Sequence, residues 1–195
     1  MEPFAALDRA RAEAERRLDA VGPDQWSLPT PCTEWTVRDV VRHLVVGNKM
    51  AALLVSGASR DDTLAQIRVW HHADGTLAPD ALVAAFRTSA DAQAAALGRL
   101  GVLELTVHHP VGDIPGAQLL RFRVGDMTLH AWDLARAIGA DDQLDPELAD
   151  DVYTSMAPMA PFISPLGMFG SGPSGEVDES APAQVRLLDL SGRRS

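Results

Sequence analysis

The chain has 195 residues, of which 46% are hydrophobic and only 5% aromatic, a composition typical of a globular protein rich in helices. It carries 17 Lys and Arg against 27 Asp and Glu, which gives a net charge of -10, and no basic cluster with interleaved aromatic residues is visible. This charge argues against nucleic acid and anionic membranes as partners, because phosphate groups are bound by positive surfaces.

Cysteine content and hydropathy indicate a compartment. The one cysteine, Cys32, cannot form an internal disulfide, which favours a reducing cytoplasm. The first residues lack the basic and apolar regions of a signal peptide, and no apolar run is long enough to span a bilayer. We therefore expect a cytoplasmic protein, in which Cys32 is a half-buried packing residue rather than a redox-active thiol.

Apolar residues at helical spacing predict two helices in the first part of the chain. The first is expected over residues 7–20 and the second over residues 36–55, where Thr36 and Asp39 form a start like a capping box. Residues 25–34 between them are predicted to form an ordered loop packed by its tryptophans. The second helix is apolar over a wide arc, which suits the centre of a bundle.

The middle of the chain is less regular. Residues 59–77 are polar and mixed, so we expect a loop with irregular turns there. A third helix is predicted over 79–100, followed by a short strand at 103–107 and turn residues at 108–116. Two pairs of adjacent histidines are expected to lie in loops, with side chains that point apart and do not share an ion: His71 with His72, and His108 with His109.

A fourth helix is predicted over residues 117–138, ending at Gly139, a residue type that suits a left-handed helix cap. A shorter helix is expected to begin near Pro146. Frequent Pro and Gly beyond residue 157 argue against regular structure until a short helix at 183–190.

Four long helices with modest connections predict an all-α, up-and-down four-helix bundle. We expect residues 1–157 to form this bundle together with a short extra helix. Residues 158–195 are expected to form an irregular tail rich in Pro and Gly that packs on or near the bundle. The apolar side chains that suggest this packing are Phe162, Ile163, Leu166, Met168 and Phe169.

The fourth predicted helix carries the clearest chemical signal. Asp126 and His130 stand four residues apart, which places both side chains on one helix face. Together they can form half of a divalent-metal site, and His43 in the second helix is the best third ligand. Two histidines and a carboxylate with open positions suit Zn, Ni, Fe or Mn, with zinc as the default metal. Residues 1–157 are therefore expected to be a metal-binding domain.

Alternatives remain open at two acidic positions. A buried carboxylate needs a partner, and Arg123 or another arginine can neutralise Asp126 in place of a metal. Asp133 lies one turn beyond His130 and can accept a hydrogen bond from the second ring nitrogen of that histidine. The other prediction for Asp133 is an ion pair with Arg136 or with an arginine near the N-terminus.

Two long segments resemble the signatures of one family. Residues 29–45, which begin Pro-Thr-Pro-Cys-Thr-Glu-Trp, are similar to the first signature of actinobacterial relatives of mycothiol-dependent maleylpyruvate isomerase. Residues 121–139, which contain Gly-Asp-Met-Thr-Leu-His-Ala-Trp-Asp, resemble the second, and residues 178–193 resemble the end of the same subfamily. The resemblance covers nearly the whole chain and implies a DinB/YfiT-like four-helix bundle.

The resemblance also implies a site and a chemistry. It implies a metal held by His43, Asp126 and His130, with Asp where the best-known members carry Glu. It further implies a transferase or isomerase that activates a low-molecular-weight thiol such as mycothiol against a small electrophile, and a homodimer. The alternatives are a non-catalytic metal or small-molecule binding protein, for example in a stress response, and a structural bundle without a metal.

Overall fold

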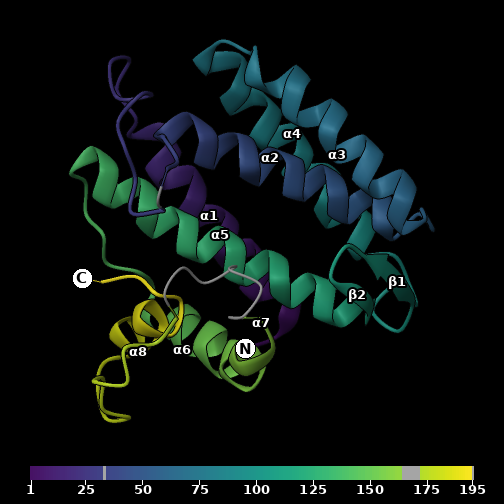
Figure 1. The fold of residues 1–195 in the computed structure, drawn as a ribbon. Helices are drawn as coiled ribbons and strands as arrows, with labels where there is room; N and C mark the ends of the chain where they lie inside the picture. Colours follow the sequence, from purple (N-terminus) through teal and green to yellow (C-terminus); the bar gives the residue numbers. More distant parts are fainter. Residues whose placement is uncertain (33, 164–171, 195) are drawn as a thin grey trace.

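The computed structural model describes residues 1–32, 34–163 and 172–194 (Figure 1). Four long helices form a bundle, and they match the four long helices predicted from the sequence. These helices are α1 (Pro3–Asp19), α2 (Val37–Leu54), α4 (Pro79–Leu97) and α5 (Gly116–Ile138). The predicted all-α four-helix bundle is therefore confirmed.

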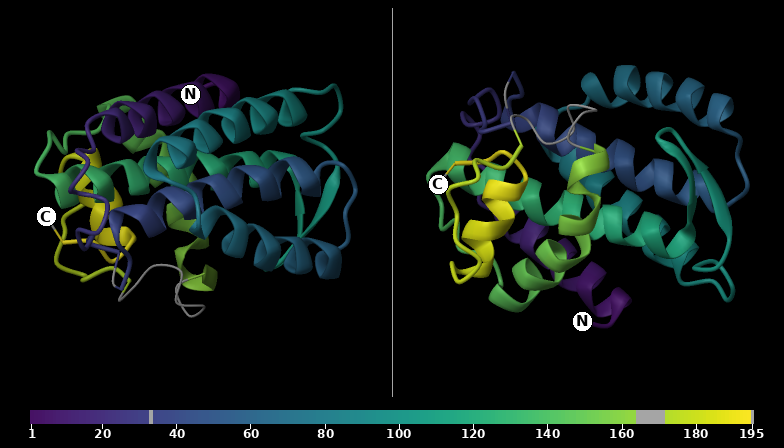
Figure 2. Two further views of the ribbon diagram at one scale, coloured as in Figure 1. Left: turned by 90° about the horizontal axis from the view of Figure 1, so that it is seen from above. Right: turned by 60° about the horizontal axis from the view of Figure 1, so that its bottom comes forward.

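Within the bundle, α2 packs along α4, α1 packs along α5, and α2 also contacts α5 (Figure 2). Each helix contributes apolar side chains to one core, where Leu7, Val41, Phe86 and Leu119 are at most 3% exposed. Burial of each such side chain stabilises the fold by about 1.5–3 kcal/mol. The pair of α2 and α5 carries the three predicted metal ligands.

Local signals fix the ends of these two helices. The Thr36 hydroxyl accepts a hydrogen bond from the backbone N–H of Asp39, and the Asp39 carboxylate accepts one from the backbone N–H of Thr36. This reciprocal pair is the predicted capping box at the start of α2. At the other site helix, Gly139 ends α5 with a φ of 70°, which confirms the predicted left-handed cap.

The loop predicted over residues 59–77 is wrong, because α3 (Arg60–Gly75) occupies it. The Ser59 hydroxyl caps this helix by accepting from the backbone N–H of Asp62. Most of α3 is exposed, so its sequence lacks the apolar stripe from which helices are recognised. The Lys49 ammonium of α2 lies 2.8 Å from both carboxylate oxygens of the buried Asp74 and ties α3 to the bundle.

A two-stranded antiparallel hairpin follows α4. It pairs β1 (Thr106–His109) with β2 (Gly112–Pro115). The predicted strand thus lies three residues further along the chain, and the predicted turn contains its partner strand. The loop placement of the adjacent histidines is also wrong: His71 and His72 lie in α3, and His108 and His109 lie in β1.

The chain after the bundle is partly helical. It contains α6 (Pro146–Met156), the short 3₁₀ helix η1 (Ala157–Met159), α7 (Ala160–Ile163) and α8 (Ala183–Leu190). The predicted helices at Pro146 and 183–190 are confirmed, and α8 packs on α6 with Leu187 and Leu188 buried. The predicted contacts of Phe162, Ile163, Leu166, Met168 and Phe169 lie outside the side chains that the structure describes. Among the described residues, we find no helix whose length and apolar content would let it cross a membrane.

Candidate metal centre

The three predicted metal ligands meet between α2 and α5. Nε2 of His43 lies 3.0 Å from Oδ1 of Asp126, and Nε2 of His130 lies 3.5 Å from the same oxygen. The three ligand atoms all lie within 4.8 Å of one another. The helical spacing of Asp126 and His130 and the approach of α2 together produce this cluster.

The spacing of these atoms fits a metal ion. A metal bound to nitrogen and oxygen ligands at about 2.0–2.2 Å separates neighbouring ligand atoms by about 3.0–3.6 Å. The two distances from the Asp126 oxygen, 3.0 and 3.5 Å, fall in this range. A hydrogen bond between His43 and Asp126 accounts for the 3.0 Å contact when no metal is bound. The donor set of two nitrogens and one oxygen suits zinc and its neighbours.

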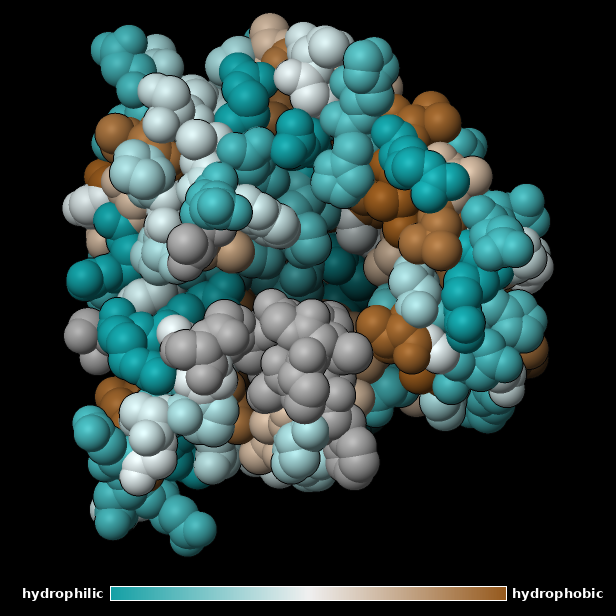
Figure 3. All heavy atoms as spheres, in the orientation of Figure 1, coloured by the Kyte–Doolittle hydropathy of each residue, from teal (hydrophilic) through white to brown (hydrophobic). Residues whose placement is uncertain are grey.

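The cluster is open to solvent on one side. The side chain of His43 is 31% exposed and that of Asp126 is 24% exposed, whereas that of His130 is 8% exposed. Figure 3 shows a hollow with mostly hydrophilic residues near the centre of this view. Asp126 and His43 are the more solvent-accessible members of the cluster.

Asp126 also has an arginine partner. Nη1 of Arg123 donates to Oδ2 of Asp126 at 2.7 Å, one helical turn away. Burial acts to raise the pKa of Asp126, but electrostatic interactions with His43 and Arg123 outweigh it and hold the pKa well below its usual value. Asp126 is thus an anion with one oxygen on Arg123 and the other facing the two histidines. The predicted arginine partner is therefore present, and the second oxygen faces the two predicted histidine ligands.

Arg123 is itself fixed by a buried polar network. Its guanidinium donates to Oε1 of Gln93 at 2.9 Å and to Oδ1 of Asn48 at 3.0 Å, and all three residues are at most 3% exposed. Gly47 makes room for it, since a Cβ at that position would lie 2.3 Å from Nη1 of Arg123. No local sequence pattern indicates this network, because its members come from α2, α4 and α5.

Asp133 supports His130 from the opposite side. Nδ1 of His130 lies 2.8 Å from Oδ2 of Asp133, whose side chain is fully buried. Burial acts to raise the pKa of Asp133, but hydrogen bonds from His130 and Arg193 outweigh this effect, so the pKa lies below its usual value. The ionised carboxylate can only accept, so Nδ1 of His130 carries a proton, and in the neutral ring Nε2 is then the nitrogen with the lone pair. The predicted hydrogen bond to His130 is therefore present.

The arginine that pairs with Asp133 differs from the prediction. Arg193, and neither Arg136 nor an N-terminal arginine, donates to both oxygens of Asp133, at 2.8 and 2.6 Å. Arg136 pairs instead with Asp142 on the surface. The prediction named a neighbour on the same helix or an arginine near the N-terminus, whereas the observed partner follows 60 residues later in the sequence.

Trp35 covers the two histidines. Its ring stacks on that of His130, with centroids 5.7 Å apart and planes 22° apart, and lies 4.8 Å from the His43 ring. The predicted packing of the tryptophans before α2 is confirmed for the described residues, since Trp26 is 7% exposed and Trp35 packs on the core. Trp35 thus provides an apolar wall for the cluster.

Cys32 lies closer to the site than its predicted packing role implies. It is half-buried, and its sulfur forms a second group of metal-ligating atoms with His130 and Asp133, all within 4.8 Å. Burial and the charge of Asp133 raise the pKa of the Cys32 thiol. No base near Cys32 is visible in the sequence, because the two neighbours come from α5.

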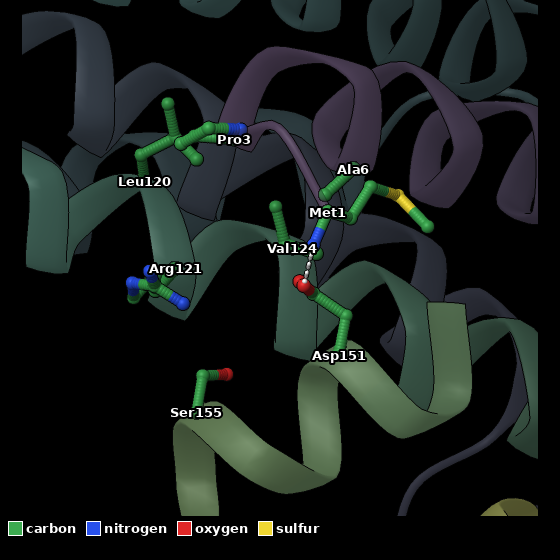
Figure 4. Close-up of a pocket in the computed structure, with 8 residues that line it drawn as sticks. All are labelled: Met1, Pro3, Ala6, Leu120, Arg121, Val124, Asp151 and Ser155. Carbon is green, nitrogen blue, oxygen red and sulfur yellow. Dashed lines mark hydrogen bonds and ion pairs between the residues drawn. The ribbon is translucent and has the colours of Figure 1, made fainter. Parts of the chain in front are cut away.

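A separate cavity near the N-terminus is too small for a substrate (Figure 4). Its volume of about 10 Å³ matches roughly one water molecule. The Met1 amino group closes it through an ion pair of 2.6 Å with Asp151. The cavity is lined by α1, α5 and α6 and contains none of the metal-site residues.

Comparisons with known proteins agree with this architecture. Uncharacterized protein Rv0738 of Mycobacterium tuberculosis strain ATCC 25618 / H37Rv is 34% identical over 151 residues, which cover 76% of this chain and 74% of the relative. Uncharacterized protein MT0763 of strain CDC 1551 / Oshkosh matches with the same values.

Two solved structures share the fold. Both are crystal structures of mycothiol-dependent maleylpyruvate isomerase, one of them a histidine-to-alanine mutant, and both are 18% identical to this chain. The mutant superposes with a TM-score of 0.66 and the other structure with 0.63, each covering 82% of this chain and 68% of the isomerase chain. These values establish a shared DinB-like fold.

A family model identifies the part of the chain that carries the likeness. The model described as the mycothiol maleylpyruvate isomerase N-terminal domain matches residues 7–135. That range holds α2 and α4 in full, most of α1 and α5, the cluster of His43, Asp126 and His130, and Asp133, and it ends before Arg193. The chain therefore belongs to the mycothiol maleylpyruvate isomerase N-terminal domain family.

Proposed function

We propose that this protein is a divalent-metal-dependent transferase or isomerase that uses a low-molecular-weight thiol of the mycothiol type against a small electrophile. The observation that carries the proposal is the cluster of His43, Asp126 and His130 at metal-ligand spacing with one side exposed. Family membership supports the thiol, because the family is named for a mycothiol-dependent enzyme.

The chain's own residues prepare such a site. Asp133 fixes the His130 ring so that Nε2 faces the Asp126 oxygen. Arg123 pairs with one Asp126 oxygen, the other oxygen faces the two histidines, and the Trp35 ring packs against both histidine rings. When bound, a divalent cation with open positions lowers the pKa of a thiol and supplies thiolate at neutral pH. Zinc is the default cation for this donor set.

The proposal extends to the organisation of the chain. We assign metal binding to residues 1–157 and a supporting role to residues 158–195, of which α8 packs on α6. The homodimer and the cytoplasmic location stay predictions.

Metal content and thiol binding test the proposal together. Protein purified without a nickel column should contain about one equivalent of a transition metal. Titration with mycothiol in a calorimeter should give a binding signal, and an electrophile panel should yield thiol conjugates or isomerised products. The variant His43→Ala should lose metal and thiol binding together, whereas His72→Ala, which removes an exposed histidine of α3, should keep both. Full metal occupancy without thiol binding would favour a non-catalytic metal-binding protein.

The ion pair between Arg123 and Asp126 favours a second candidate, a structural bundle that needs no metal. In that case the arginine alone neutralises the carboxylate. Metal-free purified protein whose thermal stability is the same with and without added zinc would support this candidate, because a ligand bound only to the folded state raises stability.

A further inference from the structure

The metal cluster is tied to a residue beyond the matched family domain. Arg193 follows α8 and lies 58 positions beyond residue 135, the last residue of the match (193 minus 135). Nε of Arg193 donates to Oδ1 of Asp133 at 2.8 Å, and Nη2 donates to Oδ2 at 2.6 Å. The side chain of Arg193 is 10% exposed and that of Asp133 is fully buried. This two-point contact fixes the plane of the carboxylate.

The same carboxylate orients a predicted metal ligand. Oδ2 of Asp133 accepts from Nδ1 of His130 at 2.8 Å, and the opposite ring nitrogen of His130 faces Asp126. A carboxylate behind a ligating histidine fixes both its tautomer and its ring angle. Rotation of the Asp133 carboxylate would therefore turn His130 away from the cluster.

The local backbone holds Arg193 in place. Gly192 adopts a φ of 73°, in the left-handed region that favours glycine, and reverses the chain after α8. The N–H of Arg193 then donates to the carbonyl of Leu188 at 2.8 Å. Leu187 and Leu188 anchor α8 in the core, so the guanidinium is presented by a packed element.

We propose that Arg193 is a positioning residue of the metal centre, which holds the Asp133 carboxylate so that His130 presents Nε2 to the metal. This inference rests on the proposed metal site and extends that site beyond the family domain to the segment after α8. It predicts that metal affinity depends on Arg193 only through Asp133.

A double-mutant cycle tests this dependence, with zinc affinity measured by competition against a chromophoric chelator. Arg193→Gln should weaken zinc binding by about 10- to 100-fold, the usual effect of losing a group that orients a ligand. Arg193→Lys should restore part of the loss, because an ammonium keeps the charge but lacks the planar fork. In an Asp133→Asn background, Arg193→Gln should have little further effect.

Arg186→Gln is the matched control. It removes an arginine of α8 that pairs with the exposed Asp150 and does not contact the site, so zinc affinity should change by less than about twofold. If Arg193→Gln does not fold, the neutral double variant Asp133→Asn/Arg193→Gln and the Arg193→Lys variant carry the test. The proposal is overturned if Arg193→Gln and Arg186→Gln have equal effects, or if the Arg193→Gln effect is undiminished in the Asp133→Asn background.

A second readout needs no metal. Nitrogen NMR of the His130 ring in metal-free protein should show the Nδ1–H tautomer, and Arg193→Gln should reduce its population. If the wild-type protein binds no zinc, the proposed function fails, while this NMR change still shows whether Arg193 positions His130. An unchanged tautomer together with unchanged zinc affinity in Arg193→Gln would overturn the inference.

Discussion

Two carboxylates two turns apart on α5, Asp126 and Asp133, have similar partners and different surroundings. Each contacts an arginine and His130, and Asp126 contacts His43 as well. The Asp126 side chain is 24% exposed, whereas that of Asp133 is fully buried with both oxygens occupied by donors. The difference shows which acid can accept a new ligand: Asp126 keeps an oxygen toward the open side, and Asp133 has none to offer.

The two acids also differ in where their arginine partners lie in the chain. Arg123 lies one turn from Asp126 on the same helix, inside the family domain, and is braced by Gln93 and Asn48. Arg193 comes from a segment 60 residues beyond Asp133. The Asp126 pair is therefore local to the bundle, while the Asp133 pair joins the bundle to the later part of the chain.

The largest expected effect is on stability, from Asp133→Ala. Removal of this carboxylate leaves the guanidinium of Arg193 buried without its partner, so the metal-free protein should lose about 3–5 kcal/mol in its free energy of unfolding. Urea denaturation measures this loss. Asp126→Ala should cost less, because its carboxylate is partly exposed and Arg123 keeps Gln93 and Asn48 as partners.

Asp150→Ala provides the control for this pair of variants. It breaks a surface ion pair between the 58% exposed Asp150 and Arg186, worth at most about 1 kcal/mol. A larger loss of stability in Asp126→Ala than in Asp133→Ala would contradict the contrast drawn between the two acids.

The next effect concerns stability at acidic pH, where a histidine outside the site is expected to act at higher pH than the two carboxylates. Burial lowers the pKa of His109 from 6.5 to about 4. As the pH falls below 6.5, His109 binds a proton in the unfolded chain but stays neutral in the folded chain down to about pH 4. The free energy of unfolding should therefore fall by about 3 kcal/mol between pH 6.5 and 4, and His109 should make it no lower above pH 6.5. Denaturation midpoints across this range measure the slope.

His109→Gln should remove most of that slope, while His108→Gln, on the exposed side of the same strand, should leave it. Part of the slope should remain through His71, whose pKa burial also lowers. The pKa values of Asp126 and Asp133 are lowered, so their stabilising charge is present above 3.8 and is lost only as the pH falls further. A slope unchanged in His109→Gln would contradict this assignment.

A smaller effect is expected from Gly47→Ala, which tests the Asp126 side. The new methyl would lie 2.3 Å from Nη1 and 2.7 Å from Cζ of the anchored Arg123, so the network must shift. Overpacking of this kind costs about 1–3 kcal/mol, measured by urea denaturation. Gly125→Ala is the matched helix glycine, where the nearest atom is Sδ of Met156 at 3.0 Å on a flexible side chain. Equal effects would show that Arg123 is not tightly held.

The smallest effect should come from Cys32→Ser. The cysteine offers a second ligand group with His130 and Asp133, but burial raises its thiol pKa and Asp133 already has its donors. Zinc affinity should therefore change by less than about threefold, because thiolate rather than thiol is the metal ligand. A loss of several orders of magnitude would place the metal in the Cys32 group and reverse the roles of the two acids.

Local patterns in the sequence predicted most of the fold and the proximity of His43, Asp126 and His130. Helical periodicity defined the bundle helices, and the spacing of Asp126 and His130 placed them on one face. Helix α3 was missed because a cap and the Lys49–Asp74 pair stabilise it in place of an apolar stripe. Arg193 and Cys32 were missed because only the tertiary fold brings them to α5, and no periodicity relates residues so far apart.

The contact between Asp133 and Arg193 also bears on how the protein is made. Ribosomes add about 5–20 residues per second, so Arg193 is synthesised about 3–12 s after Asp133. For most of that interval the residues of all four bundle helices have been synthesised, while the buried Asp133 of α5 still lacks Arg193. Complete assembly of the centre therefore waits for the segment after α8, and premature termination before Arg193 would leave a bundle with an unbalanced interior charge.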